Sequence, residues 1–279
     1  MKTHAVILLI YISCILPSVA LTSADDIDTN RPSFTDSPLV VPQASLELEN
    51  GTMYQHSQHG KNYVDIPENE IRLGLTNSTE FQMFTPSWAF LNSPQSSSSV
   101  GLATSRPSFT NSQTPGGFQT GITDLYEVGI KQAIKQPLFK DLNLAFIGGV
   151  NAPVGKQVFS STGVQPVLRA PWSKPVYGSW SVSGMQSLIV INSGRDVQWQ
   201  NFWLINKSFG SRTSIFIEYA GFITHHNSAS NIIHFGIVRK LNAHNQIDLH
   251  FGFGLDKTAP ATFVGTGYSF RFDHLPLLD

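Results

Sequence analysis

The fold of this chain is decided by the stretch Gln246-Ile247-Asp248-Leu249-His250-Phe251-Gly252-Phe253-Gly254-Leu255-Asp256. Every second residue in it is large and apolar, and the residues between them are charged, polar or glycine. A period of two places these two sets on opposite faces of a β-strand. The same alternation recurs in residues 46–49, 70–75, 211–224 and 264–272. We therefore expect a protein built from strands with one apolar face.

Charged residues are scarce in the sequence. The 279 residues include 18 Lys and Arg and 19 Asp and Glu, a net charge of −1. The charged share of 13% is about half of the roughly 25% usual in soluble domains. This composition excludes a polybasic nucleic-acid-binding protein, a charged disordered chain and a bundle of membrane helices. It leaves a large all-β protein, either soluble or in a membrane.

The N-terminus has the pattern of a secretory signal peptide. Lys2 precedes an apolar run at residues 5–16, and small residues then offer cleavage sites after Ala20 or Ala24. This run is shorter than the roughly 20 residues that a membrane helix needs. We assign residues 1–24 to the signal, so the mature chain loses Cys14, the only cysteine. After the signal, no stretch approaches 18 apolar residues.

Alternating strands fit a soluble β-sandwich or a membrane β-barrel, and three features favour the barrel. One strand face is uniformly apolar, while the other carries charge and glycine, as a lumen would. Long connections, expected at residues 54–69, 91–120 and 153–163, alternate with short ones at 76–78, 208–210 and 241–245. Aromatic residues gather near strand ends, where barrels have interfacial girdles: Trp88, Phe90, Tyr126, Trp172, Tyr177, Trp180, Trp199, Trp203, Tyr268 and Phe272.

A first count gives eleven strands, at residues 45–53, 70–76, 79–90, 121–134, 142–152, 178–192, 197–207, 211–224, 231–241, 245–255 and 262–272. A single-chain bacterial barrel normally has an even number. The long and short connections fall out of phase between residues 153 and 178, and a further strand at 164–172, turning at 173–177, restores the phase. We predict one antiparallel transmembrane β-barrel of about 12 strands over residues 44–272, with about 10 as the alternative, and a tail at 273–279.

Several motifs resemble an outer-membrane transporter-like family associated with the MetA pathway of phenol degradation. The most specific is Asp28-Thr29-Asn30-Arg31-Pro32-Ser33-Phe34-Thr35-Asp36-Ser37-Pro38, which leads into a strand with Leu46-Glu47-Leu48-Glu49-Asn50-Gly51. Further matches are Arg72-Leu73-Gly74-Leu75-Thr76-Asn77, Gly121-Ile122-Thr123-Asp124 and Ala152-Pro153-Val154-Gly155. The resemblance covers nearly the whole mature chain. It implies a bacterial outer-membrane barrel that moves small molecules, with aromatic or hydrophobic solutes as candidates.

Strand parity places one set of charged residues inside the barrel. Its members are Glu47, Glu49, Arg72, Glu127, Lys131, Glu218, Asp248, His250 and Arg271. They would form either a constriction that filters solutes or a closed ionic network that holds a narrow barrel together. Residues 25–43 are too polar and rich in proline for a membrane strand. We expect them to be a periplasmic arm or plug, either pairing Arg31 and Asp36 with the wall as a gate or serving as a solvated arm.

The last strand resembles the signal that barrel-assembly machinery recognises, a glycine followed by two aromatic residues two positions apart. Gly267, Phe270 and Phe272 fit this pattern. The expected partners are therefore this machinery, outer-membrane lipid and a small solute that the sequence does not identify. We expect no nucleic-acid partner, no cofactor and no metal ion.

We expect a channel for the passive passage of small solutes rather than an enzyme, located in the bacterial outer membrane after export. Two alternatives stay open. One is a lipid-modifying outer-membrane hydrolase that uses His226 and Ser228, because a His and a Ser two positions apart share a strand face. The other is a closed structural or adhesive barrel whose long loops contact partners.

Overall fold

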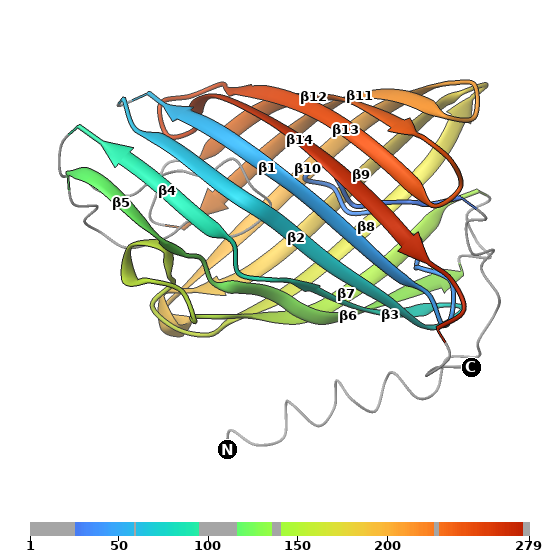
Figure 1. Ribbon diagram of the computed structural model, residues 1–279, viewed down its shortest axis with the longest axis horizontal. Coiled ribbons are helices and arrows are strands. Elements are labelled where there is room, and N and C mark those ends of the chain that lie inside the picture. The colour runs from blue at the N-terminus through green and yellow to red at the C-terminus, as the bar shows by residue number, and fades with distance from the viewer. Residues whose placement is uncertain (1–25, 59, 95–115, 136–140, 226–228, 276–279) are drawn as a thin grey trace, which may run out of the picture.

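The computed structural model describes residues 26–58, 60–94, 116–135, 141–225 and 229–275. These residues form one antiparallel sheet of fourteen strand segments that closes on itself through the pairing of β1 with both β14 and β2 (Figure 1). The strands are β1 Leu46–Ser57, β2 Asn62–Thr76, β3 Thr79–Phe84, β4 Trp88–Ser93, β5 Gly117–Ile122, β6 Leu125–Lys135, β7 Asn143–Ala152, β8 Gln165–Tyr177, β9 Trp180–Ile191, β10 Asp196–Phe209, β11 Thr213–Thr224, β12 Ser230–Lys240, β13 Asn245–Gly254 and β14 Pro260–Phe272.

The wall of the barrel has twelve strands, which confirms the predicted fold. β3 and β4 both pair with β2, so they share one place in the ring. β5 and β6 share the next place, because β5 pairs with β4 and β6 pairs with β3. Within the described residues, no helix has the length and apolar character needed to span a membrane.

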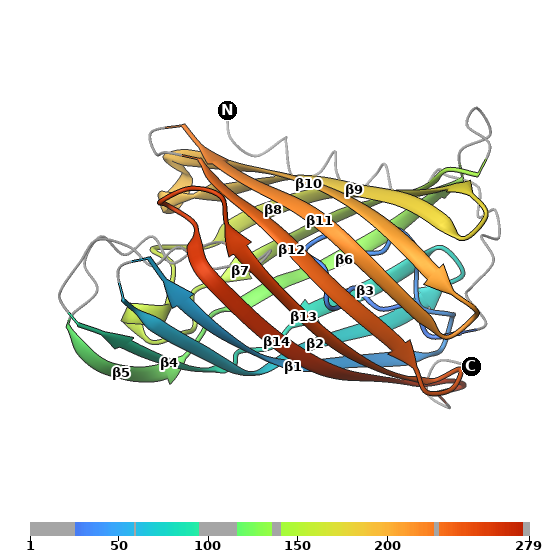
Figure 2. The same cartoon turned by 90° about the horizontal axis from the view of Figure 1, so that it is seen from above.

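Two strands that the sequence predicts as continuous are interrupted side by side. The predicted strand 79–90 breaks after Phe84, where Pro86 has no N–H to give to the sheet. The predicted strand 121–134 breaks at residues 123–124, and the Ser87 amide donates to the Thr123 hydroxyl at 3.0 Å across this joint. The interruptions change the direction of β4 and β5, which diverge from the other strands in Figure 2.

Two predicted boundaries are wrong. Residues 54–69 are not a long loop: β1 continues to Ser57 and β2 starts at Asn62, because the inward and outward alternation continues through both segments. Pro67 fits within β2 because it lies in a β-bulge, where it need not donate a ladder hydrogen bond. Residues 173–177 are not a turn either. β8 continues to Tyr177, and the chain reverses at Gly178, whose φ of 56° suits glycine.

The two faces of the wall have opposite chemistry. The outward side chains are mostly large and apolar, and many are exposed, among them Leu249, Phe251 and Phe253 on β13. The inward side chains include buried Glu, Arg, Lys, Gln and His. We call the end where β1 begins and β14 ends the terminal end, and the opposite end the loop end. The longer connection at residues 153–164 lies at the loop end.

Residues 26–45 form no strand and lie inside the ring of strands, where they are drawn in blue in Figures 1 and 2. We call them the luminal segment. Its side chains are largely buried: Ile27 is 0% exposed, Asn30 3% and Asp36 3%. The segment therefore occupies the barrel interior instead of leaving it open.

Candidate functional site in the barrel lumen

Carboxylates of the wall hold the backbone of the luminal segment. The segment has few partners of its own for its amide groups, and buried amides need acceptors. Glu49 on β1 accepts from the amides of Asn30 at 2.9 Å and Arg31 at 2.7 Å. Glu80 on β3 accepts from the amide of Val41 at 2.7 Å. The inward carboxylates thus replace the hydrogen bonds that a strand would supply.

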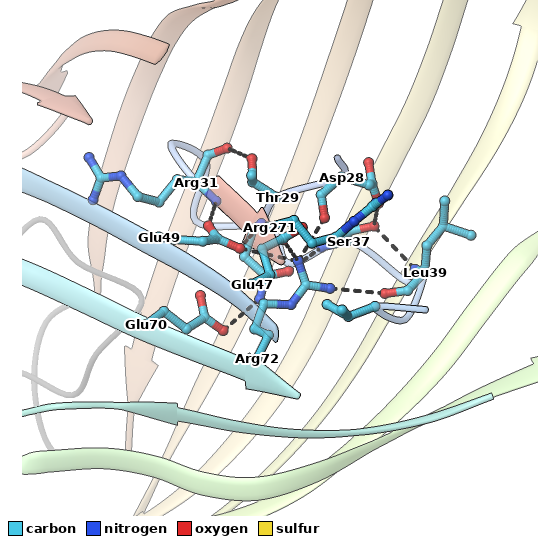
Figure 3. Close-up of polar contacts among 12 residues, drawn as sticks. Asp28, Thr29, Arg31, Ser37, Leu39, Glu47, Glu49, Glu70, Arg72 and Arg271 are labelled. Carbon is cyan, nitrogen blue, oxygen red and sulfur yellow. Dashed lines mark hydrogen bonds and ion pairs between the residues drawn. The ribbon is translucent and has the colours of Figure 1, made fainter. Parts of the chain in front are cut away.

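Arg72 of β2 is the centre of the largest ionic cluster (Figure 3). Its guanidinium lies 2.8 Å from Glu47, 3.1 Å from Glu49 and 2.9 Å from Glu80. It also donates to the backbone carbonyls of Asp28 at 2.7 Å and Leu39 at 3.2 Å in the luminal segment. The Arg72 side chain therefore both neutralises the carboxylates around it and holds the backbone of the luminal segment.

Lys131 of β6 completes this cluster. Its ammonium group lies 2.9 Å from Glu80 and 3.4 Å from the side-chain oxygen of Asn30. The Asn30 side-chain nitrogen donates to Glu70 at 2.7 Å. All of these groups are buried, so the cluster is an ionic network away from bulk solvent.

Arg31 connects the luminal segment to β2 and β13. Its guanidinium lies 3.0 Å from Glu68 and 3.4 Å from Asp248. It passes over Gly51 and Gly267, which face each other across β1 and β14. A Cβ at either glycine would overlap Arg31. Burial acts to lower the pKa of Arg31, but the Asp248 and Glu68 carboxylates outweigh it and raise that pKa.

Asp36 joins the luminal segment to β8. Its carboxylate lies 3.1 Å from Arg169, and Arg169 also contacts Glu127 of β6 at 2.5 Å. All three side chains are buried. This bridge crosses the lumen on the side away from Arg31.

An aromatic pocket receives Phe34. The rings of Phe202, Phe222 and Phe263 lie with their centroids 5.9, 6.1 and 5.9 Å from the Phe34 ring. His234 of β12 is nearer still, at 4.7 Å. Such distances are those of favourable aromatic pairs, so the pocket holds Phe34 against the inner face of β10, β11, β12 and β14.

Next to this pocket, three buried polar side chains on β11, β12 and β13 form a row of hydrogen bonds. Glu218 of β11 accepts from the Phe34 amide at 2.9 Å and from the Thr35 amide at 2.8 Å and hydroxyl at 2.7 Å. His234 Nδ1 lies 2.8 Å from Glu218, and His234 Nε2 lies 3.0 Å from His250 Nδ1. If His234 donates to Glu218, its other nitrogen accepts from His250. This row therefore sets one tautomer for both rings.

Residues 153–164 pack against the loop end of the barrel. The buried carboxylate of Asp124 accepts from the Gly155 amide at 3.0 Å, the Ser160 hydroxyl at 2.7 Å and the Ser161 amide at 2.7 Å. Phe159 is 1% exposed and packs against Tyr63 of β2 with ring centroids 6.4 Å apart. The motifs 121–124 and 152–155, distant in sequence, therefore meet at this joint.

The structure places all nine predicted lumen residues on the inner face of the barrel, where each is buried. It brings Glu47, Glu49, Arg72 and Lys131 into one network and places the others in separate groups. Arg271 lies at the terminal end, 2.8 Å from Asp273. Partial burial acts to raise the pKa of Asp273, but hydrogen bonds from Arg271 and His244 outweigh it and lower that pKa to about 2.

Other predicted residues have mixed positions. Gly267 lies beneath Arg31, whereas Phe270 and Phe272 lie on the outer face of β14 with ring centroids 5.3 Å apart. His226 and Ser228 lie outside the described residues, as does the predicted signal peptide. In the described part of the chain, no group of three or more His, Cys, Asp or Glu could hold a metal ion.

Sequence reasoning missed several residues of the site, namely Glu68, Glu70, Glu80, Arg169 and His234. Parity was a usable signal for Glu70, which is two positions before Arg72 on the same strand. Glu68 has the same parity as Glu70 but was missed because residues 54–69 were expected to be a loop, and Arg169 was obscured by the flanking prolines.

The fold resembles that of an outer-membrane channel of known structure. An outer membrane channel from Pseudomonas putida F1 superposes with a TM-score of 0.57 at 14% identity, covering 88% of this chain and 100% of that one. The KdgM porin gives 0.46 at 12% identity, over 80% and 99% of the two chains. An anion-selective porin from Comamonas acidovorans gives 0.36 at 11% identity, over 82% and 98%.

None of the curated protein sequences compared with the chain matches it. A family model does match, over residues 29–272, and so includes the luminal segment from Thr29 onward together with every strand of the wall. The motifs that resemble this family lie where the luminal segment, the wall and the 153–164 loop meet. The chain belongs to the family described as "MetA-pathway of phenol degradation".

Proposed function

We propose that this protein is a bacterial outer-membrane channel through which small solutes cross passively, and that the luminal segment is its plug. The observation that carries this proposal is a closed barrel whose interior is occupied by a segment of its own chain, held by hydrogen bonds, ion pairs and aromatic packing. Such noncovalent contacts can break and re-form without the cleavage of a covalent bond. A structural barrel needs only a filled interior, whereas a gate needs a filling that can move.

The orientation follows the usual design of such barrels, with short turns and both termini in the periplasm. The terminal end would face the periplasm, so the plug would enter from that side. The loop end, where residues 153–164 pack, would face the exterior. Export would use the predicted signal peptide, and the concentration gradient of the solute would drive transport.

The contacts of the plug are unevenly distributed, and this suggests how it would open. Toward β1, β2 and β3 it meets Glu49, Arg72 and Glu80. Toward β11 it meets Glu218, which accepts three hydrogen bonds from it. Toward β8 it is held by the ion pair of Asp36 with Arg169. We propose that the plug releases the β8 side first and pivots on the Arg72 cluster. The cargo is small, and the family description suggests aromatic or hydrophobic molecules.

Conductance across a planar bilayer tests the proposal. We expect the unmodified protein to be mostly closed, Asp36→Asn to open more often, and deletion of residues 26–42 to give a steady pore. Asp141→Asn is the matched control, because Asp141 is an exposed aspartate at the terminal end of the barrel. Identical conductance in the unmodified and deleted chains, with both shown to be folded, would reject the plug. A silent deletion variant would instead favour the structural barrel.

A further inference from the structure

A cavity of about 260 Å³ lies beside the luminal segment. One side of it is the luminal segment itself, from Asp28 to Leu39, and the other is the inner face of the wall from β8 to β13. The Arg72 cluster lies toward β1 to β3, away from this space. The interior therefore has a densely ionic side and a side that is partly open.

Short polar side chains keep this space open. Ser181 and Ser183 on β9, Asn206 on β10 and Ser214 on β11 line it. They are half-buried, and within the described residues none of their side chains makes a hydrogen bond. Leu204 on β10, with Phe216 on β11, adds an apolar patch to the same wall. The wall thus offers unused hydroxyl and amide groups next to apolar surface.

Three of the four charged side chains that line the cavity have an oppositely charged partner. Arg31 is paired with Glu68 and Asp248, and Asp36 is paired with Arg169. Asp28 accepts from the Ser37 hydroxyl. Lys240, at the mouth, lies 3.8 Å from Asp26. An anion that entered would lose hydration without gaining an unpaired positive charge, which is unfavourable. A cation would meet only the Asp28 carboxylate, which already accepts a hydrogen bond from Ser37.

We infer that this cavity is the terminal-end half of the permeation path and that it binds small uncharged solutes bearing hydroxyl groups. The inference rests on the proposed channel function and specifies its route and solute class. A hydroxylated solute would exchange hydrogen bonds with Ser181, Ser183 and Ser214 while its carbon skeleton contacts Leu204 and Phe216. Asp36 lies on the cavity lining, so breaking its pair with Arg169 would extend the path along β8 toward the loop end.

Swelling of proteoliposomes tests the solute class with three probes of matched size. These are sorbitol, which is neutral, gluconate, which is an anion, and glucosamine at a pH where it is a cation. We expect sorbitol to enter roughly tenfold faster than either ion, because the cavity offers an anion no unpaired cation and offers a cation only the hydrogen-bonded Asp28 carboxylate. The full chain is used unmodified and as Asp36→Asn. Equal rates for the three probes would overturn the solute class.

Two further variants test the route. Ser183→Phe should fill the cavity and reduce sorbitol entry several-fold, whereas the matched control Val182→Phe, on the outer face of the same strand, should leave entry unchanged. Should Ser183→Phe fail to fold, Ser183→Cys in a Cys14→Ser chain can be blocked after folding with a bulky neutral thiol reagent. Flux that survives either block would overturn the route but leave the channel intact. Absence of flux in both the unmodified and Asp36→Asn chains would overturn the channel proposal and this inference together.

Discussion

Single carboxylates decide how firmly the luminal segment is held, and Glu218 carries the most contacts to the Phe34 region. Its two oxygens accept from Phe34, Thr35 and His234. Glu218→Gln keeps the shape of the side chain but replaces one carboxylate oxygen by an NH₂ group. This group would face N–H donors instead of accepting from them. We expect a loss of about 1–3 kcal/mol at this anchor and more frequent channel openings in bilayer recordings. Glu70→Gln is the control, because only one Glu70 oxygen meets the segment; equal effects would refute this ranking.

Gly51 has no side chain, and this leaves space for the Arg31 guanidinium. In Gly51→Ala the new methyl group would occupy the position of the guanidinium, which must then leave Glu68 and Asp248. We expect a destabilisation of about 1–3 kcal/mol in urea unfolding, together with a leakier channel. Gly148→Ala controls for loss of a strand glycine, because a Cβ there meets nothing within 4 Å. If the two variants behave alike, Gly51 does not serve Arg31.

At the scale of elements, Asp124 links the joint between β5 and β6 to the 153–164 connection. Asp124→Asn replaces one acceptor oxygen by a donor, so the amides of Gly155 and Ser161 cannot both keep their bonds. We expect faster hydrogen exchange at these two amides, and faster proteolysis between residues 153 and 164, with the barrel intact. Asp196→Asn, at a loop-end turn with one local hydrogen bond, is the control. Unchanged exchange in Asp124→Asn would show that the Asp124 carboxylate does not hold the connection.

Strands were largely predictable because each obeys one local rule, the alternation of apolar and polar residues. The rule works where a strand is regular, as in β13, and it fails where geometry departs from two residues per repeat. The bulge at Pro67 hid half of β2, and the joint at Pro86 looked like continuous strand. The site was predictable only as an inner face. Which inward charges meet depends on strand register, and the pairing of Glu218 with His234 follows from a register that one sequence does not display.

At the scale of the whole molecule, the protein is charged within and apolar on its outer face, which requires a lipid environment. The prediction is that a charge on the outer face is tolerated according to depth. Leu249→Arg, in the middle of β13, should cost about 2–4 kcal/mol, whereas Leu255→Arg, just beyond that strand, should cost about 0–1 kcal/mol. Both leucines are more than half exposed on the isolated barrel, at 52% and 58%, so solvent accessibility alone predicts no difference. Urea unfolding in lipid vesicles, followed by tryptophan fluorescence, measures both. Only a hydrocarbon layer around β13 separates the two variants, so equal costs would place this barrel outside a membrane.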